Sequence, residues 1–272
     1  MDIRLLIISF VQGIGELLPI SSSVNMFFAK YIFNMEFFNF SFKIALHVGS
    51  LIALLFYFRN DILDIFKGIF SSSKKLRDTY FYPLFIGTIP VVFFGYFSRD
   101  FVKEFQDTNI MGILCIIFGI LLWIVDRSAC SRLRRMDRNR FISLYKSLWI
   151  GIFQTIAVFP GVSRLGITLT ASRLFSIDRK KSIHFSMFLA IPSIMGSLVL
   201  ELYECYTTNQ YNVLFSNNSL IGLFLTSIIS IIFIYPCIHF MERKGFFILM
   251  IYRCIIGFAL LKIDFIMSLF NK

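Results

Sequence analysis

Glu16 is a carboxylate within an otherwise apolar stretch near the N-terminus of the chain. Gln12 precedes it by four residues, so the two side chains would share one face of a helix. A carboxylate among apolar residues is costly unless it is paired or solvated, and such a residue usually has a function. Two roles remain open: chemistry at a reactive site, or an ion pair with an arginine that locks two helices together.

Hydroxyl side chains follow this carboxylate directly. Pro19 is succeeded by three consecutive serines and an asparagine: Ser21, Ser22, Ser23 and Asn25. A proline with N-capping residues behind it is typical of the first turn of a new helix, whose free N–H groups attract phosphate. A plain helix cap is the alternative interpretation of the same serines.

A second polar cluster lies in the other half of the chain. Its members are Gly161, Ser163, Arg164, Gly166 and Thr168. The arginine needs an anion, either Glu16 or a phosphate, and the guanidinium fork matches phosphate oxygens. If the two clusters meet, they form a phosphate-handling site. Glu16 would there bind Mg²⁺ or Ca²⁺ once a diphosphate arrived, because these cations take oxygen ligands partly from the substrate.

The composition indicates that the helices carrying these polar residues lie in a membrane. Of 272 residues, 57% are hydrophobic and 16% are charged, against roughly 45–50% and about 25% in soluble domains. So much apolar surface would drive aggregation in water. The net charge of +11 comes from basic residues in short loops between apolar stretches, which argues against nucleic acid as a partner. The five cysteines form no CxxC pair, so no disulfide or metal framework follows.

The apolar stretches of the chain are of two kinds: uninterrupted runs, and stretches interrupted by polar residues, glycine and proline. Six apolar runs are long enough to cross about 30 Å of hydrocarbon: 42–58, 80–97, 108–125, 183–203, 219–240 and 246–262. Two further stretches, 3–33 and 143–175, contain Gly, Pro, Ser and charges, as expected of helices broken inside the membrane. The predicted fold is an all-α polytopic membrane protein, one domain over 1–272, with about six transmembrane helices and two re-entrant helical hairpins.

Basic residues predict the orientation of these spans. The loop 126–140 contains six arginines, and the loop 59–78 contains five lysines and arginines. Because cytoplasmic loops carry an excess of such residues, both loops are predicted to be cytoplasmic and both termini external.

The two halves of the chain repeat one pattern. A Gln is followed by Pro six or seven residues later and by Ser three residues beyond it, and a similar apolar run comes next. The repeated stretches are 12–22 and 154–163 and the runs that begin at Phe42 and Phe185. The pseudo-repeats, about 1–125 and 143–262, would have opposite topology. Inverted repeats of broken helices place their polar site near the repeat interface.

The two polar clusters lie in the motifs QGIGELLPISSS at 12–23 and FPGVSRLGIT at 159–168. These motifs resemble the signature motifs of the bacitracin-resistance-type undecaprenyl pyrophosphate phosphatases, and the likeness extends to 46–53, 185–192 and 251–253. The resemblance implies a multi-pass enzyme of the bacterial cytoplasmic membrane. It would remove the terminal phosphate of undecaprenyl diphosphate at the outer face, recycle this lipid carrier of cell-wall synthesis and protect against bacitracin.

The resemblance also assigns roles to individual residues. Glu16, Ser22 and Arg164 become the catalytic residues, with Glu16 also the ligand of Mg²⁺ or Ca²⁺. Arg164 would hold the phosphate while Ser22, or a water activated near Glu16, attacks the terminal phosphorus. The residues expected to bind substrate are Gln12, Ser21, Ser23, Asn25, Ser163, Gly166 and Thr168.

One departure from the family pattern bears on the chemistry. Family members usually have Gly-His where this chain has Val24-Asn25, and Ser where it has Leu165. Asn cannot accept a proton near neutral pH as His can. If that His is the base or the nucleophile, this chain must use another group or be slow or inactive. His47 lies in a predicted span, and it either approaches the site as the replacement or packs between helices.

Two other functions remain open at this stage. Inverted repeats of broken helices are also a transporter architecture, so a lipid transporter or flippase is one alternative. An inactive, binding-only relative is the other, motivated by Asn25. The expected partners are undecaprenyl diphosphate and membrane lipids, with no nucleic acid, and the oligomeric state is left open.

Overall fold

The computed structural model describes residues 2–33, 35, 40–71, 79–98, 101–102, 105, 107–131, 142–207 and 216–262. Within these ranges the protein is all-helical, which confirms the predicted class. The helices are α1 (Ile3–Gly15), α2 (Ser22–Ile32), α3 (Phe40–Tyr57), α4 (Arg59–Ser71), α6 (Phe81–Phe97), α8 (Thr108–Ser131), α9 (Leu144–Gln154), η2 (Thr155–Val158), α10 (Arg164–Leu174), α11 (Arg179–Thr207), α12 (Asn217–Lys244) and α13 (Phe247–Leu261).

The six predicted spans coincide with six helices: α3, α6, α8, α11, α12 and α13. In the described part of the chain, α8, α11 and α12 are long and apolar enough to cross a membrane, and so is α3 taken together with α4. The helices α6 and α13 are apolar but shorter. The protein is therefore a polytopic membrane protein, and six crossings remain a prediction. Residues 72–78 and 132–141, which carry many of the basic side chains, lie outside the described residues.

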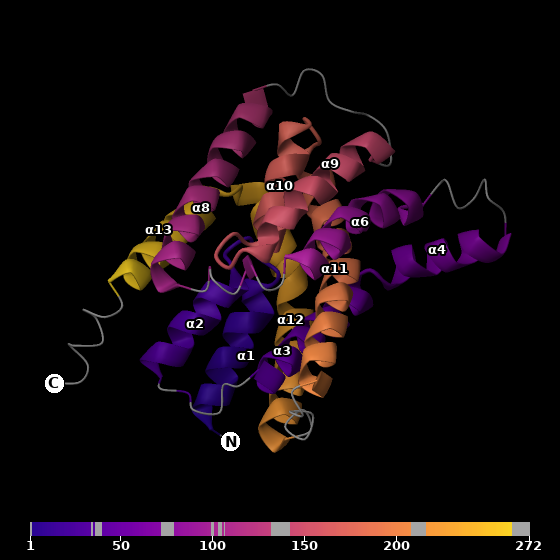
Figure 1. Ribbon diagram of the computed structural model, residues 1–272. Coiled ribbons are helices and arrows are strands. Elements are labelled where there is room, and N and C mark those ends of the chain that lie inside the picture. Colours follow the sequence, from indigo (N-terminus) through magenta and orange to yellow (C-terminus); the bar gives the residue numbers. More distant parts are fainter. Residues whose placement is uncertain are drawn as a thin grey trace.

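Helix α4 was not predicted, because the stretch 59–78 was interpreted as a loop. Asp61, Asp64 and Lys67 recur every three positions, so they gather on one helical face and leave an apolar face opposite. The helix turns by 70° from α3 and projects from the rest of the molecule (Figure 1). The charges are thus the polar face of an amphipathic helix rather than the mark of a loop.

Both predicted broken segments are pairs of helices separated by a break. The first pair is α1 and α2, and the second is α9 with η2 and α10. The residue before the second helix of each pair has a left-handed backbone, with φ 63° at Ser21 and 66° at Ser163. This conformation is costly for residues other than glycine and is concentrated at functional sites. Spacing in the sequence matched Ser22 with Ser163, whereas the backbone matches Ser21 with Ser163.

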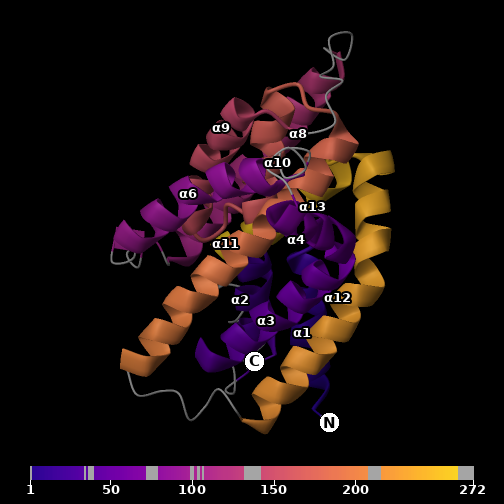
Figure 2. The same cartoon turned by 90° about the vertical axis from the view of Figure 1, so that its right-hand side faces the viewer.

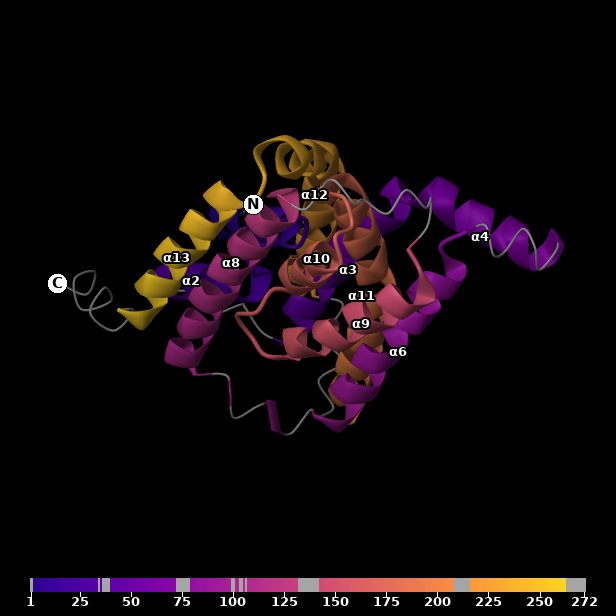
Figure 3. The same ribbon diagram turned by 90° about the horizontal axis from the view of Figure 1, so that it is seen from above.

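Each broken helix packs against a helix from the other half of the chain. Helix α1 lies on α12, and α9 lies on α6. Two further contacts, α3 with α11 and α8 with α13, also join the halves. Figure 3 shows the α8–α13 pair at one edge and the α6–α9 pair at another, with α10 between them. In Figure 2, α3 lies between the long helices α11 and α12. The boundaries of the pseudo-repeats stay a prediction.

Small residues lie where these helices approach most closely. A Cβ added at Gly151 of α9 would collide with the backbone of Gly87 of α6, and one added at Gly112 of α8 would lie 2.8 Å from the carbonyl of Gly257. The Ser230 hydroxyl of α12 donates to the Gly13 carbonyl of α1 at 3.1 Å. Close backbone approach at glycines and serines is typical of packed membrane helices.

A buried ionic cluster joins three helices at one end of the molecule. Arg173 of α10 donates its Nε to Asp126 Oδ1 at 2.8 Å, and Arg179 of α11 donates Nη2 to Asp126 Oδ2 at 2.6 Å. Arg179 also donates to the Glu242 carbonyl at 3.2 Å. Asp126 was assigned to the loop 126–140, but it lies in α8 and is buried. Local sequence could not indicate this, since its partners are about fifty residues away in the chain.

Candidate active site

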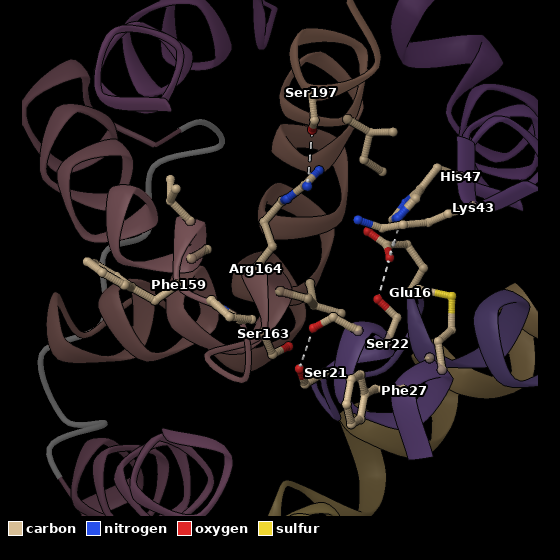
Figure 4. A pocket seen from close by; sticks show the side chains of 18 of the residues that line it. Glu16, Ser21, Ser22, Phe27, Lys43, His47, Phe159, Ser163, Arg164 and Ser197 are labelled. Atoms are coloured by element: carbon tan, nitrogen blue, oxygen red, sulfur yellow. Dashed lines mark hydrogen bonds and ion pairs between the residues drawn. The ribbon is translucent and has the colours of Figure 1, made fainter. Parts of the chain in front are cut away.

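A cavity of about 570 Å³ lies where the two breaks meet. It is within the size range of small-molecule sites, roughly 300–1,000 Å³. Polar side chains from both broken segments, and from α3 and α11, line it: Glu16, Ser21, Ser22, Ser23, Lys30, Lys43, His47, Ser163, Arg164, Ser197 and Glu201. Figure 4 shows Glu16 and Ser22 on one side of this cavity and Arg164 on another. The fold therefore brings together the two clusters that the sequence singled out.

Glu16 stands at the C-terminal end of α1, where its N–H still donates to the Gln12 carbonyl at 3.0 Å. Its carboxylate Oε2 accepts the Ser22 hydroxyl at 2.8 Å and the Gln12 Nε2 at 3.3 Å. The His47 Nδ1 lies 3.9 Å from the same oxygen. A hydroxyl that donates to a carboxylate in a cavity is the arrangement of a nucleophile and its base. No arginine among the described residues pairs with Glu16, so the helix-locking ion pair is not observed.

Arg164 begins α10, directly after the strained Ser163. The Ser163 hydroxyl caps this helix by accepting the Gly166 N–H at 3.2 Å. Arg164 donates Nη2 to the Ser197 hydroxyl at 3.3 Å, while its buried Nη1 has no hydrogen-bond partner in the described part of the chain. A buried cation without an anion is unfavourable, and its free donor matches a phosphate oxygen. The geometry therefore favours phosphate over Glu16 as the anion of Arg164.

The rest of the cavity wall is apolar. It consists of Leu18, Met26, Phe27, Val102, Met111, Ala157, Val158, Phe159, Pro160, Leu165, Ile194 and Leu198, with Gly15. Apolar walls beside a few convergent polar groups are typical of sites for small amphiphilic ligands. A ligand with an anionic head and a hydrocarbon tail would find both kinds of surface here.

Six of the ten predicted site residues line the cavity: Glu16, Ser21, Ser22, Ser23, Ser163 and Arg164. The other four, Gln12, Asn25, Gly166 and Thr168, lie behind it and contact residues of its wall. Gln12 is fully buried and donates to Glu16, and Gly166 donates its N–H to Ser163. The Thr168 hydroxyl donates to the carbonyl of Arg164 one helical turn earlier, at 3.1 Å.

Several residues of the cavity were missed or left open by the sequence analysis. His47 approaches the site, since its Nδ1 lies 3.3 Å from the Gln12 Nε2 that donates to Glu16. Lys43 and His47 are one turn apart on α3, and the Lys43 Nζ lies 3.5 Å from Glu201 Oε1 of α11. Ionisable residues within apolar spans were the available signal for Lys43 and Glu201, because such residues usually mark functional sites.

Asn25 points away from the cavity and holds the first break in place. Its Nδ2 donates to the carbonyls of Ile20 and Ser21, at 3.0 and 2.9 Å. Its Oδ1 accepts the hydroxyl of Tyr252 in α13. The Ser21 carbonyl also accepts the Asn25 N–H at 3.2 Å, whereas the Ile20 carbonyl, before the start of α2, accepts the side-chain donor. Asn25 therefore supports the strained backbone at Ser21, and its departure from His removes no base from the cavity wall.

This placement predicts the outcome of Asn25→His. We expect no gain in kcat, because the new imidazole would face Tyr252 and the carbonyls rather than the cavity. We also expect a lower melting temperature, since an imidazole cannot both donate to the two carbonyls and accept from Tyr252 as the amide does, and a lost buried hydrogen bond costs about 1–3 kcal/mol. Phosphate release and thermal unfolding of the purified variant measure the two effects. A rise in kcat of about 100-fold or more, the scale of general acid–base catalysis, would contradict this assignment.

Comparison with known proteins identifies a family that covers the cavity and the helices around it. The family described as "Bacitracin resistance protein BacA" matches residues 5–259. An undecaprenyl-diphosphatase of Pelagibacter ubique is 36% identical over 265 residues, which is 95% of this chain and 96% of the relative. Undecaprenyl-diphosphatases of Caldicellulosiruptor bescii and Saccharophagus degradans are 30% and 31% identical, over 93% of this chain and 94% of each relative.

Proposed function

The chain belongs to the bacitracin resistance protein BacA family, and on that premise we propose that it is an undecaprenyl-diphosphatase. It hydrolyses undecaprenyl diphosphate to undecaprenyl phosphate and inorganic phosphate. Its relatives carry this name over nearly their whole length. Bacitracin resistance fits the family name, and return of the lipid carrier to the monophosphate form is the expected cellular role.

One observation in the site carries this proposal. The Ser22 hydroxyl donates to the Glu16 carboxylate at 2.8 Å, in the same cavity in which Arg164 keeps a donor nitrogen without a partner among the described residues. A nucleophile, its base and a phosphate-binding cation are the three groups that phosphoryl transfer needs from a protein. The apolar wall beside them suits the first isoprene units of the lipid.

The positions of these groups suggest how the chain performs the reaction. Arg164 and the N–H groups at the start of α10 hold the terminal phosphate and neutralise its charge. Glu16 takes the Ser22 proton while the Ser22 oxygen bonds to the terminal phosphorus and the bridging P–O bond breaks, which releases undecaprenyl phosphate. Glu16 passes this proton to the departing undecaprenyl phosphate and becomes a carboxylate again. Water then attacks the phosphoserine, Glu16 accepts the proton of that water, and the Ser22 oxygen is reprotonated as inorganic phosphate leaves. If water attacks directly, Glu16 has the same role and Ser22 only holds the phosphate.

We further propose that the reaction uses a divalent cation, Mg²⁺ or Ca²⁺, and that Glu16 is its protein ligand. No group of three or more His, Cys, Asp or Glu side chains in the described ranges is placed to hold a metal alone. The donor set still fits these cations, because they accept one carboxylate with hydroxyl, water and phosphate oxygens. Such a cation would neutralise charge on the diphosphate when bound.

We also propose that the site faces the outer side of the cytoplasmic membrane. Asp126 begins the Arg-rich stretch that is predicted to be cytoplasmic. It binds Arg179, which also donates to the Glu242 carbonyl, so three helices carry charged residues at this end of the molecule. Basic residues near span ends are typical of the cytoplasmic side. The cavity between the breaks would then open toward the opposite side.

The proposal is tested by phosphate release from undecaprenyl diphosphate in detergent. We expect turnover with Mg²⁺ or Ca²⁺ and a loss on the order of 100-fold when a chelator removes divalent cations. Protein boiled before the assay and farnesyl monophosphate as substrate are the controls. Lipid binding without phosphate release would instead indicate a binding-only relative, and movement of labelled lipid across vesicles without release would indicate a transporter. Metal-independent turnover would support the phosphatase and contradict the cation.

A further inference from the structure

A second arginine, Arg253 of α13, is buried behind the cavity and has no role in the mechanism above. Only 1% of its surface is exposed. No carboxylate in the described part of the chain forms an ion pair with it; its partners there are backbone carbonyls. A buried cation is costly unless its hydrogen bonds are complete, so this arrangement calls for a specific reason.

Three of the four carbonyls that Arg253 binds come from the two helix breaks. Nη1 donates to Pro19 at 3.2 Å, and Nη2 donates to Gly161 and Val162 at 2.9 and 3.2 Å. Nε donates to Cys115 of α8 at 2.9 Å. Carbonyls at a break have lost their helical partners, and the flat guanidinium is the side chain with donors in enough directions to serve several of them. One side chain thus ties the first break to the second.

The atoms bound by Arg253 are close in the chain to the reacting groups. Pro19 precedes the strained Ser21 by two residues, and Val162 immediately precedes the strained Ser163. Ser22 and Arg164, the proposed nucleophile and phosphate clamp, are the next residues in each segment. The neighbouring Tyr252 supports the first break too, through Asn25. Tyr252 and Arg253, which are consecutive in α13, therefore both help to fix the position of Ser22 relative to Arg164.

Two glycines leave room for this arginine. A Cβ added at Gly166 would lie 3.0 Å from Arg253 Nη1, and one added at Gly119 of α8 would lie 3.0 Å from its Cβ and 3.2 Å from its Nε. Either contact would force the arginine to move. Gly166, predicted from sequence to bind substrate, thus has an observed role in accommodating Arg253.

We propose that Arg253 is a positioning residue for phosphoryl transfer. It holds the two breaks so that Ser22 and Arg164 face one diphosphate, and its positive charge, left without an anion in the described structure, adds to the attraction of the cavity for that diphosphate. This proposal rests on the proposed function, because it concerns the same reaction. Misplacement of catalytic groups by about 1 Å costs on the order of 100-fold in rate, so the expected effect is large.

The test compares Arg253→Lys and Arg253→Met with the wild-type protein in detergent, well below each melting temperature. We expect kcat to fall roughly 100-fold in Arg253→Met, with a smaller change in KM because Arg164 remains. Arg253→Lys should recover part of kcat, since it keeps the charge but bonds fewer carbonyls. The matched control is Arg173→Lys, because Arg173 is also a buried arginine but lies in the last turn of α10, where it binds Asp126. It should lower the melting temperature and leave kcat nearly unchanged.

A milder variant decides the question if the Arg253 variants do not fold. Gly119→Ala would crowd the arginine, whereas Gly196→Ala adds a Cβ that meets only Val92, at an ordinary 3.6 Å. A kcat lowered in Gly119→Ala but not in Gly196→Ala would support the proposal. Equal kcat in these two proteins, or a folded Arg253→Met with wild-type kcat, would overturn it. An inactive wild-type protein would instead contradict the proposed function itself.

Discussion

Replacement of Glu16 by glutamine is expected to lower kcat by on the order of 10³-fold at saturating lipid substrate, within the 10²–10⁴-fold range of general acid–base catalysis. Glutamine keeps the shape of the side chain and can still contact Ser22, but it cannot accept the proton that the 2.8 Å hydrogen bond now directs to the carboxylate. If Glu16 also holds the divalent cation, the apparent affinity for Mg²⁺ should fall as well. Phosphate release as a function of lipid and Mg²⁺ concentration measures both effects.

Glu201 offers a matched control for this variant. It is a second carboxylate of the same cavity, but it contacts Lys43 rather than a hydroxyl near Ser22. We expect Glu201→Gln to change kcat by less than about tenfold, because it removes no proton acceptor from the reacting group. Glu16→Ala with unchanged turnover would refute the assignment of Glu16.

Removal of the Arg164 side chain in Arg164→Ala is expected to lower kcat/KM by on the order of 10³–10⁵-fold, the range for arginines that stabilise a transferring phosphoryl group. The free Nη1 of Arg164 has no partner among the described residues, so its interaction energy is available to the substrate phosphate. Arg164→Lys should fall between wild type and alanine, since lysine keeps the charge but cannot bind two phosphate oxygens in the same fork.

Ser197→Ala separates the phosphate contact of Arg164 from its orientation. The Ser197 hydroxyl accepts from Arg164 Nη2 at 3.3 Å, so its loss should loosen the guanidinium and reduce kcat/KM by roughly 10- to 100-fold, the worth of one hydrogen bond to a charged group. Kinetics over a range of lipid concentrations distinguish the three variants. If Arg164→Ala were as active as Ser197→Ala, Arg164 would not be the phosphate clamp.

Much of the fold was predictable because membrane helices are encoded locally. The length of an apolar run shows whether it can span the bilayer, and Gly, Pro and Ser within such a run break the helix where they occur. The six apolar helices, both broken segments and the polar residues at each break follow from this rule. Helix α4 was missed because its four charges in thirteen residues suggest a loop, whereas their spacing indicates one polar face of a helix.

The membership of the cavity was predictable only in part. Residues beside the breaks, such as Ser22 and Arg164, were identified from local polarity. Lys43, His47 and Glu201 enter the cavity because α3 and α11 pack against each other, and that contact joins residues more than 150 positions apart. Asn25 was expected to contact substrate, yet the direction of its side chain depends on Tyr252, which is 227 positions away.

The sequence by itself determined that this protein is a helical membrane protein with two broken helices, a carboxylate with hydroxyls at one break and an arginine at the other. These properties depend on neighbours in the chain, since hydropathy, helix breaking and capping act over a few residues. Only the tertiary structure decided that Glu16 binds Ser22 rather than Arg164 and that Arg253 joins the two breaks. Such contacts depend on how the halves of the chain pack, because a guanidinium chooses its partners by distance in space and not by position in the sequence.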